Sequence, residues 1–388
     1  MLLLSFDLEA LAPLTFPERK PGVQFNASLP YVPGAALFGA LGQVFGAQDS
    51  FDAALLRAIR CHNAYPARQN DAWVRPLPAT AIQPKGADAG EHVADSLYAR
   101  VCWERQQPPA LIYAPTDADG RPWEAVGQKF YTLSDGRLRY RSVQQRVLTR
   151  VAIHRQRGTA QDQRLYSLLA IRETTEVETE DGARRAPARF RGSIALPADA
   201  SDAVIKALDQ VTHLGGRQTS GLGAVRIEAS STAPPADEAG QVLQRVNAMT
   251  QRFQEQARLY ADLGGSPWPI TGSIFTVNLL ADAILLEDGW LPTQELSAEQ
   301  LQALTGIEAT LLRAFTTTRT IGGWHVLWQR PKPTSVTVAM GGVYVFQTDR
   351  PLSEEDCRRL ARLQLDGIGE RRTEGYGQVR VCDEFHLR

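Results

Sequence analysis

Short strand-like runs of apolar and polar residues alternate along the chain with segments of helical spacing. LLLSFDLEAL at 2–11 and ARFRGSIALP at 188–197 predict strands. The segment 201–214 begins with a serine and spaces its apolar residues three and four apart, which predicts a capped helix. AVRIEA at 224–229 predicts a strand directly after that helix. The N-terminal part thus has a first strand, followed later by strand, helix and strand.

The same order of elements returns in the C-terminal part. SIFTVNLLADAIL at 273–285 and SVTVAMGGVYVFQ at 335–347 each predict a strand, 353–365 predicts a serine-capped helix, and QVRVCD at 378–383 predicts a closing strand. Two such halves indicate an α+β fold made of two ferredoxin-like units. Each unit would have an antiparallel sheet with helices on one face, as in RNA-recognition modules.

Composition places the boundary between the halves. SSTAPPADEAG at 230–240 has the proline, alanine and acidic content of a linker. We therefore expect an N-terminal domain at 1–232, a linker and connecting helix at 233–265, and a C-terminal domain at 266–388. The N-terminal domain carries a proline-rich, weakly patterned insertion at about 63–127.

One glycine-rich stretch occurs in both halves, between the last helix and the last strand. LGGRQTSGLGAVRI at 214–227 and IGERRTEGYGQVRV at 368–381 agree at seven of fourteen positions. The first copy is not a P-loop, because Leu222 and Gly223 stand where Lys and Ser/Thr are required, and it lacks the third glycine of a dinucleotide fingerprint. Both copies lead from a predicted helix into a predicted strand, so neither has the helix N-terminus that usually holds a nucleotide phosphate. ATP and NAD are therefore not expected. The loops instead suit either contact between backbone N–H groups and RNA phosphates or close packing on their own sheet or a neighbour.

Charge is balanced overall but not along the chain. The net charge is −1, and 37 of the 42 basic residues are arginine. The segment 137–157 has seven arginines and His154 with no acidic residue. Such a local field attracts phosphates, although the same pattern also suits a solvated strand face whose partners lie elsewhere.

Cysteine use and the N-terminus bear on metal, redox state and location. The four cysteines are scattered without a C-x-x-C pair, so neither a disulfide framework nor a zinc ribbon is indicated. One alternative is a zinc site made of Cys61, His62, His92 and Cys102. We expect no metal and no cofactor. The opening residues do not resemble a signal peptide, and no apolar run is long enough to span a membrane, so a cytoplasmic location is expected.

Several of these segments together resemble a known family. The paired glycine loops, YVPGAALFGALGQVFG at 31–46 and RVAIHRQRGTAQDQRLYSL at 150–168 resemble the RAMP superfamily of CRISPR effector subunits. GGWHVLWQRPKP at 322–333 and the second loop are similar to the large RAMP subunit of type III-D systems, in the Cas-five group. Two positions depart from the family pattern: Phe38 stands where many relatives have Arg, and Arg164 where they have Gly.

The resemblance implies a CRISPR RNA as ligand, in antiviral defence. It implies a position at the 5′ handle of that RNA, with target RNA met only indirectly, beside the large polymerase-like subunit and the backbone RAMP subunits. From the family pattern and the charge pattern together we expect RNA contacts from the first loop, the basic run and the second loop. The residues are Gly215, Gly216, Arg217, Gln218, Thr219, Ser220, Gly221, Gly223, Arg137, Arg139, Tyr140, Arg141, Arg146, Arg150, His154, Arg155, Arg157, Arg371, Arg372 and Tyr376.

Aromatic residues offer base stacking or core packing. Tyr140, Tyr166 and Trp324 are candidates for stacking on bases. Trp324 and Trp328 are four residues apart and would share one face of a helix, which favours a buried packing role.

Catalysis is the competing class of function. RNA cleavage without metal needs a general base, most often His, but none of the six histidines (His62, His92, His154, His213, His325 and His386) occurs in a pattern with a second acid or base. No acidic metal-binding cluster is evident, and Asp7 is isolated in a strand. We therefore expect a non-catalytic RNA-binding subunit. The alternatives are a CRISPR-repeat endoribonuclease that uses His154 or His213, and a protein scaffold with vestigial RNA loops.

Overall fold

The computed structural model describes residues 1–17, 25–47, 53–87, 92–106, 112–153, 156–179, 182–230, 236–325 and 330–388. The N-terminal half is organised around an antiparallel sheet with the order β16-β1-β15-β3. Its strands are β1 (Leu2–Ala10), β3 (Arg60–Cys61), β15 (Arg189–Leu196) and β16 (Val225–Ala229), and β4 (Tyr65–Ala67) also pairs with β15. The C-terminal half has the antiparallel sheet β20-β25-β17-β26. Its strands are β17 (Ile274–Leu279), β20 (Thr310–Phe315), β25 (Val343–Gln347) and β26 (Val379–Val381).

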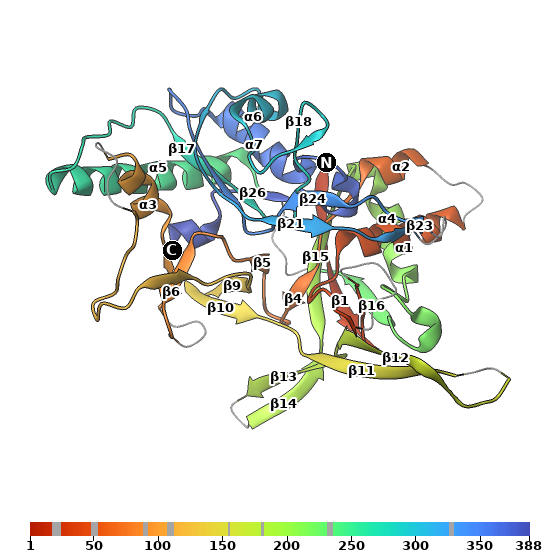
Figure 1. Ribbon diagram of the computed structural model, residues 1–388. Helices are drawn as coiled ribbons and strands as arrows, with labels where there is room; N and C mark the ends of the chain where they lie inside the picture. Colours follow the sequence, from red (N-terminus) through yellow and green to blue (C-terminus); the bar gives the residue numbers. More distant parts are fainter. Residues whose placement is uncertain are drawn as a thin grey trace.

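Helices alternate with these strands in the same way in both halves (Figure 1). α1 (Gly34–Gly46), α2 (Ala53–Ala58) and α4 (Ser201–Gln210) belong to the first half, and α6 (Ala298–Thr305) and α7 (Glu354–Asp366) to the second. Across each sheet the strands stand in the order fourth, first, third, second, which is the connectivity that the ferredoxin-like prediction requires. The predicted α+β class, with antiparallel sheets and helices, is confirmed.

Local sequence explains where the second-half helices begin. The Ser353 hydroxyl accepts a hydrogen bond from the Asp356 amide, 3.2 Å away, and the Ser297 hydroxyl accepts one from the Gln300 amide at 3.1 Å. Each serine therefore satisfies a backbone donor that the first turn of a helix leaves open. α6 ends at Gly306 in the left-handed conformation, as helices often do.

The connecting helix is part of the second core. α5 (Ala239–Asp262) buries Val242, Val246, Met249 and Phe253 against the C-terminal sheet. A separate core, which includes Phe6, Leu37 and Phe190, holds the first half together. The expected linker at 233–265 thus contains a helix that packs tightly with one half.

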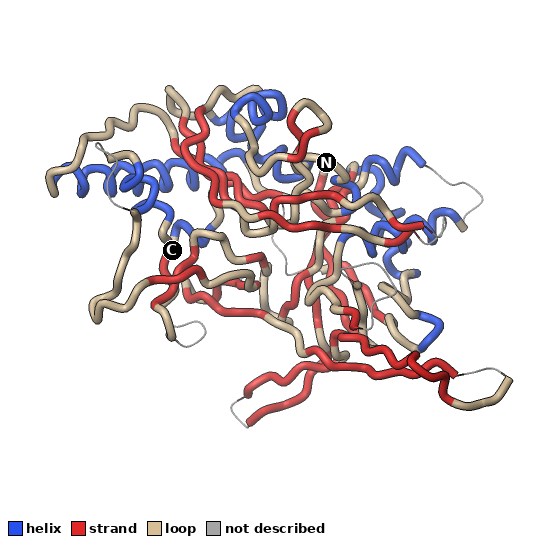
Figure 2. The backbone as a smooth tube through the Cα atoms, viewed as in Figure 1, coloured by secondary structure: helices blue, strands red, loops and turns tan. Residues whose placement is uncertain are grey.

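Two large segments of the first half lie outside its sheet. The insertion contains β5 (Arg75–Pro76), β6 (Ala81–Pro84), β7 (Ala94–Asp95), α3 (Leu97–Glu104) and β8 (Trp123–Ala125), followed by the hairpin β9 (Phe130–Ser134) and β10 (Arg137–Arg141). The second segment is a projecting arm of β11 (Gln145–Ile153) and β12 (Ala160–Ile171), with β2 (Phe25–Asn26) beside β12 and the hairpin β13 (Thr174–Thr179) and β14 (Gly182–Pro187) after it. Figure 2 shows this arm as strands that extend away from the helices.

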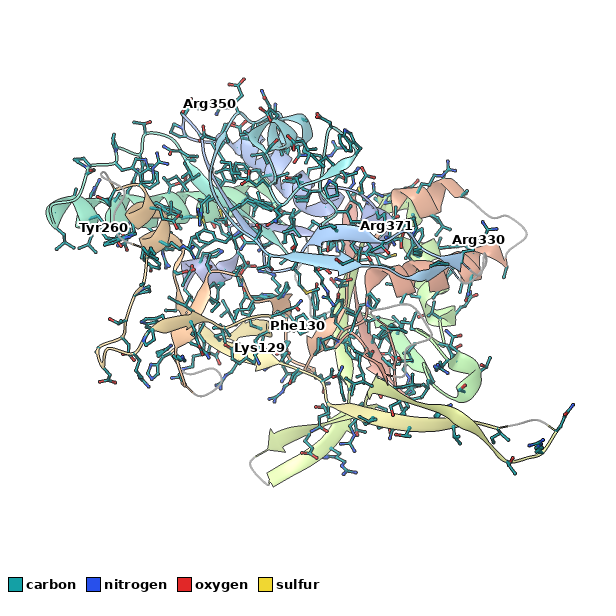
Figure 3. All side chains as sticks on the ribbon, viewed as in Figure 1. Lys129, Phe130, Tyr260, Arg330, Arg350 and Arg371 are labelled. Carbon is teal, nitrogen blue, oxygen red and sulfur yellow. The ribbon has the colours of Figure 1, made fainter. Side chains whose placement is uncertain are left out.

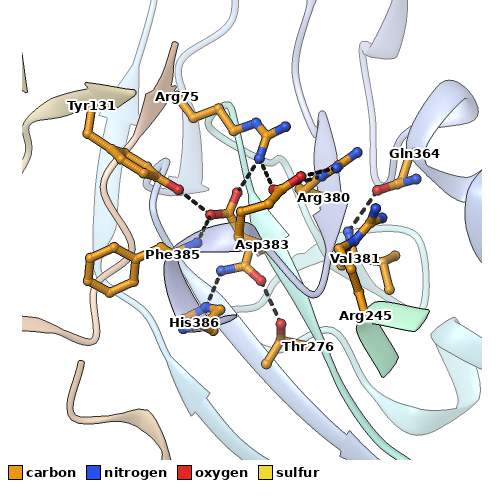
Figure 4. A network of polar contacts seen from close by, with 12 residues as sticks. Arg75, Tyr131, Arg245, Thr276, Gln364, Arg380, Val381, Asp383, Phe385 and His386 are labelled. Atoms are coloured by element: carbon orange, nitrogen blue, oxygen red, sulfur yellow. Dashed lines mark hydrogen bonds and ion pairs between the residues drawn. The ribbon is translucent and has the colours of Figure 1, made fainter. Parts of the chain in front are cut away.

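The insertion is attached to the second half by a buried polar network (Figure 4). Arg75 donates to Asp383 at 3.0 Å, and the Tyr131 hydroxyl also donates to Asp383. His386 lies between Asp95 of β7 and Asn278 of β17, with nitrogen-to-oxygen and nitrogen-to-nitrogen distances of 2.6 and 2.7 Å. If Arg75 or Asp383 were truncated, the other charge would stay buried without a partner, and the fold would lose much of its stability. The insertion therefore clamps the two halves together.

Two predictions about the second half are wrong. The run 335–347 forms two strands, β24 (Ser335–Val338) and β25, which pair with different neighbours. A turn at Gly341, with φ +86°, separates them. Trp324 does not start a helical face, because Trp324 and His325 form β22 (Trp324–His325), paired with β23 (Arg330–Pro331). Trp328 lies outside the described residues.

Small elements complete the fold. β18 (Leu286–Glu287) pairs with β19 (Leu291–Pro292), and β21 (Thr318–Ile321) pairs with β24. Four short 3₁₀ turns are η1 (Ala198–Ala200), η2 (Gln218–Ser220), η3 (Arg372–Glu374) and η4 (Glu384–Leu387) in the described residues. No helix in the described ranges is both long and apolar enough to cross a bilayer.

Candidate RNA-binding site

The two glycine loops have the same backbone. Arg217 and Arg371 are both in the left-handed conformation, with φ +60° and +54°, and each is followed by a 3₁₀ turn. Gly221 and Gly375 close those turns at φ +78° and +90°. The repeat seen in the sequence is therefore a repeat of structure.

Each loop is fastened to the chain just after the first strand of its own half. In the first copy, the amides of Gly216 and Gly223 donate to the carbonyls of Thr15 and Pro13 at 3.0 and 2.9 Å. In the second, the amides of Glu370 and Gly377 donate to Ile284 and Asp282 at 3.0 and 2.9 Å. The loops thereby join the last helix and the last strand of each half to the first strand.

Most of the paired glycines are needed for packing. A Cβ at Gly215 would lie 2.5 Å from the Thr15 carbonyl oxygen, and one at Gly223 would lie 2.5 Å from that of Leu214. At Gly377 a Cβ would overlap the Ile368 carbonyl. Gly221 differs, because a Cβ there would meet nothing within 4 Å. Close packing thus explains these glycines without a ligand, whereas Gly221 lies at an open turn.

The first loop presents its turn to solvent. Arg217, Gln218, Thr219 and Ser220 are all exposed. The Arg150 guanidinium of the arm donates to the Ser220 carbonyl at 3.2 Å. The structure therefore brings together the first glycine loop and one arginine of the basic run. Backbone N–H groups, hydroxyls and arginine at one exposed turn are the groups that contact phosphates.

The second loop is instead packed against the first half. A Cβ at Gly375 would lie 2.5 Å from the Cys61 carbonyl oxygen and 3.1 Å from the Gly34 Cα. The Gly34 amide donates to the Asn63 side chain at 2.8 Å, and a Cβ at Gly34 would overlap the Cys61 carbonyl. Gly34 of the N-terminal motif therefore serves the contact between the halves.

The cations of the second loop are partly neutralised within the protein. Arg371 donates to Glu374 at 3.0 and 2.8 Å, and the Lys332 ammonium donates to the same carboxylate at 2.5 Å. The Arg371 guanidinium also lies 4.8 Å from the ring centre of Tyr376. Burial opposes ionisation of Glu374, but hydrogen bonds from Arg371 and Lys332 lower the pKa of its carboxyl below the usual value. Arg371, which is labelled in Figure 3, and Arg372 beside it are both half-buried.

The basic run does not form one continuous patch. Arg141 is bound by the buried Asp71 carboxylate, with two contacts of 2.6 Å, and Arg146 lies 3.4 Å from Glu173. These two arginines have structural partners within the fold. Arg137 and Arg139 are exposed on β10, which pairs with β9 and not with the arm.

The remaining members of the run are placed as follows. Tyr140 is half-buried, and burial raises the pKa of its phenol. Arg157 is exposed near the end of the arm. His154 and Arg155, and the side chains of Tyr166 and Trp324, lie outside the described residues. Of the predicted arginines, Arg150 has a described hydrogen bond to the first glycine loop.

The arm has an apolar face that the charge pattern did not reveal. Val147, Thr149, Val151 and Ile153 alternate along β11 and are all exposed, with Ile153 at 65%. Arg146 and Arg150 occupy the other face because strand neighbours point to opposite sides. The alternation RVLTRVAI was visible in the sequence and could have revealed this face.

A cavity of about 670 Å³ lies beside the second loop, at the junction of the halves. Tyr31, Asp282, Arg319, Glu374 and Tyr376 are among its lining residues. Burial is the main cause that raises the pKa of the Tyr31 and Tyr376 phenols, so both side chains stay protonated. Neutral aromatic rings beside an acid and a guanidinium suit a flat ligand with hydrogen-bonding edges, such as a nucleobase.

The described histidines differ in burial and in their partners. His62 is buried with Nδ1 2.8 Å from the Ser193 hydroxyl, and burial lowers its pKa to about 4. His386 belongs to the network of Figure 4. His213 is exposed before the first loop, with Nδ1 3.0 Å from the Thr212 hydroxyl. His92 is exposed in the insertion, and the side chain of His325 is not among those described.

The zinc alternative is wrong. Cys61 lies in the first core and Cys102 in the second, and both thiols are buried. Burial raises the pKa of Cys102 to about 12, so its thiol stays protonated. No group of three or more His, Cys, Asp or Glu in the described part of the chain is placed to hold a metal ion.

Comparisons with known proteins add the following similarities. Residues 269–382 match the family model described as CRISPR-associated protein (Cas_Cmr3), which confirms the predicted resemblance to RAMP-type CRISPR effector subunits for this part of the chain. A comparison with curated proteins gives no match. The assignment to type III-D stays a prediction.

Solved structures show low-level similarity over much of the chain. Two chains of a type III-B Cmr-beta complex bound to cognate target RNA, one of them also with AMPPnP, are 12% identical. In both, the match covers 88% of this chain and 86% of that chain, with TM-scores of 0.42 and 0.41. A Cas6 product complex is 16% identical over 52% of this chain and 81% of that chain, with a TM-score of 0.25. No residue role follows from likenesses of this strength.

Proposed function

We propose that this chain is a non-catalytic subunit of a type III-D CRISPR RNA-guided effector complex in antiviral defence, and that it binds the 5′ handle of the CRISPR RNA. In this proposal it also contacts the large polymerase-like subunit and the backbone RAMP subunits. The family match of residues 269–382 supports the effector class. The observation that carries RNA binding is the exposed first glycine loop, with Arg150 of the arm hydrogen-bonded to it.

The first loop can hold an RNA backbone with little rearrangement. Its glycine conformations are fixed by hydrogen bonds to Pro13 and Thr15, so the turn from Arg217 to Ser220 is already formed. A preformed site loses less conformational freedom on binding than a flexible one. Arginine and hydroxyl groups then contact phosphates, which fixes position without reading sequence. Base recognition would fall to other groups, and the cavity beside Tyr31 and Tyr376 suits that task.

The test is binding of a handle RNA oligonucleotide to the isolated chain at several salt concentrations. The variant combines Arg217→Ala with Arg150→Ala, because both residues belong to the first-loop site. We expect affinity to fall at least tenfold and the salt dependence of binding to become shallower. Each lost phosphate contact changes the slope of log K against log salt by about 0.7 for a single strand.

A matched control changes an arginine far from this site. Arg258 is exposed on α5, which Figure 1 shows at the opposite side of the molecule from the arm. Arg258→Ala should leave affinity and slope unchanged. Arg141 is unsuitable for this test, because its bond to Asp71 would make a loss of binding indistinguishable from a loss of structure. Equal affinity of the double variant and the wild type would contradict the proposed site.

Cleavage is tested separately. Purified protein is incubated with CRISPR-repeat RNA in EDTA, and His213→Ala is compared with the wild type. We expect intact RNA in both reactions, because the side-chain contact described for His213 is the Thr212 hydroxyl, which is neither an acid nor a base at neutral pH. Site-specific cleavage that the His213 variant loses would contradict the non-catalytic part of the proposal.

A further inference from the structure

One long segment of the chain has the opposite character from the basic run. Residues 259–312 contain no lysine, arginine or histidine in 54 positions, but they contain seven acidic residues. In a chain with 42 basic residues out of 388, such a gap sets this segment apart. The segment includes β17, the β18–β19 hairpin and α6. The segment therefore offers no cation of its own to a phosphate backbone, which is drawn to cations.

An exposed tryptophan stands on this acidic segment. Trp290 is 72% exposed, and Leu291 beside it is 44% exposed. Leu304 of α6 is 43% exposed and lies four residues after Gln300 on the same helix face. The Gln300 side chain donates to the Leu286 carbonyl of β18 at 2.9 Å, so this face of α6 meets the hairpin. We call Glu287, Asp288, Trp290, Leu291 and Leu304 the Trp290 knob.

The hairpin holds Trp290 in a fixed position. Asp288 and Gly289 have φ +52° and +76°, and the Trp290 amide donates to the Glu287 carbonyl at 3.1 Å. Two positive φ values closed by this bond are typical of the tight type I′ turn. Behind the turn, the Thr293 amide donates to Leu285 at 3.1 Å. The knob is thus preorganised, which lowers the entropic cost of binding.

The hydrophobic core next to the Trp290 knob is filled by other side chains. Leu296 and Leu301 fill the core from this region at 1% and 0% exposure, while Trp290 stays outside. Arg359 of α7 lies near Gly306 at the end of α6, and its guanidinium is 3.8 Å from the Glu355 carboxylate. Tryptophan is enriched among the residues that dominate protein interfaces, and clustered exposed apolar side chains mark such surfaces.

We infer that the Trp290 knob docks a neighbouring protein subunit of the effector complex, one that presents an apolar socket edged by arginine or lysine. The inference rests on the proposed function, because the effector complex supplies that partner. The sign of the charge favours a protein over RNA as occupant. Figure 1 supports this division, since β18 and α6 lie at the end of the molecule away from the arm strands β11 to β14.

The experiment measures binding of the purified chain to the remaining protein subunits of its effector complex, co-expressed and immobilised without RNA. Trp290→Ala is expected to weaken binding about 30-fold, since a tryptophan hot spot is worth about 2 kcal/mol. A charge reversal, Glu287→Lys, should slow association and weaken its salt dependence. Both variants should unfold like the wild type, because these side chains are exposed.

Matched controls change an exposed apolar residue and an exposed acid elsewhere. Ile112 is 91% exposed, and Glu124 is an exposed acid of β8. Ile112→Ala and Glu124→Lys should leave subunit binding unchanged. Equal binding of Trp290→Ala and the wild type would overturn the inference. Self-association of the wild type that Trp290→Ala abolishes would overturn it in favour of a second copy of this chain.

Handle RNA binding separates this inference from the proposed function. Every knob variant should bind handle RNA with wild-type affinity, because the first loop is not part of the knob. A Trp290→Ala chain that binds RNA and the subunits as tightly as the wild type contradicts the inference alone. A wild-type chain that binds RNA but not the subunits contradicts the inference and also the part of the proposed function that concerns partner subunits. A wild-type chain that binds neither contradicts both.

Discussion

Arg217 and Arg371 have nearly the same left-handed backbone, yet their surroundings differ. The first loop is exposed and carries no acidic residue from Gly215 through Ile227. The second contains Glu374, which holds Arg371 and Lys332, and it packs on Gly34 of the other half. A duplicated backbone has thus acquired one surface open to a ligand and one closed onto the protein. The difference teaches that a repeated motif fixes geometry, while its neighbours decide its task.

The largest expected effect separates the loops by their glycines. Gly375→Ala places a Cβ 2.5 Å from the Cys61 carbonyl oxygen at φ +90°, whereas Gly221→Ala meets open space at φ +78°. We expect Gly375→Ala to lower the free energy of unfolding by about 3 kcal/mol or more, through strain plus overlap. Gly221→Ala should cost only about 1 kcal/mol, from the left-handed conformation alone. Denaturant unfolding of both variants measures the difference, and equal losses would refute the contrast between the loops.

Truncation of the arginines should affect RNA binding in the opposite order, with the larger effect in the first loop. Arg217→Ala is expected to weaken handle RNA binding about tenfold, or roughly 1.4 kcal/mol, as loss of a phosphate contact. Arg371→Ala should leave RNA affinity close to the wild-type value but lower the midpoint of thermal unfolding, because it removes a partner of Glu374. The two readouts are fluorescence anisotropy with labelled RNA and calorimetry. If Arg371→Ala weakens RNA binding more than Arg217→Ala, then the second loop and not the first binds the RNA.

Acid sensitivity should belong to the second loop. The pKa of the Glu374 carboxyl is lowered in the folded protein, so its stabilising effect is present above the unfolded pKa and is lost as pH falls through the folded pKa. The window therefore begins near the ordinary glutamate value and extends below it. Glu374→Gln should flatten the fall of stability in this window, as measured by unfolding at stepped pH. An unchanged pH profile would show that Glu374 does not contribute as the ion pairs imply.

The smallest effect concerns the arm. Arg150→Ala removes one cation and the hydrogen bond to Ser220, while β11 keeps its ladder with β12. We expect the salt slope for handle RNA to fall by about 0.7 with only a small change in affinity. Arg226→Ala, an exposed arginine of β16 after the same loop, serves as the comparison. A larger change of the salt slope for Arg226→Ala than for Arg150→Ala would indicate that the RNA runs along β16 and not along the arm.

Local patterns predicted much of the fold. Residues 353–365 carry their own serine cap and apolar spacing, and the helix begins one residue after that serine. The two glycine loops were correctly paired because their spacing is strict and free of gaps. The prediction of one strand at 335–347 failed because a continuous apolar stretch does not show that its residues belong to two sheets, separated by a turn with Gly341 at φ +86°.

The parts of the site that depend on distant partners could not be predicted. Arg141 looked available for RNA because its partner, Asp71, is 70 residues away in the sequence. Gly34 stood only in a segment that resembles the family, and the sequence did not show that it faces the second loop across the contact between the halves. Charge along a sequence shows where cations are and not what they meet in the fold. RNA contact by the predicted residues, and the type III-D assignment, stay predictions.

The bond between Arg75 and Asp383 has a consequence for synthesis on the ribosome. The two residues are 308 positions apart in the sequence. Tyr131 and Asp95 of the same region also bind residues at the C-terminal end, Asp383 and His386. At about 5 to 20 residues per second, translation needs roughly 15 to 60 s to cover that distance. Throughout this interval the insertion has emerged but cannot reach its docking site. Its apolar residues therefore need protection during translation. The polar contacts with Asp383 and His386 can form only as one of the last steps of folding.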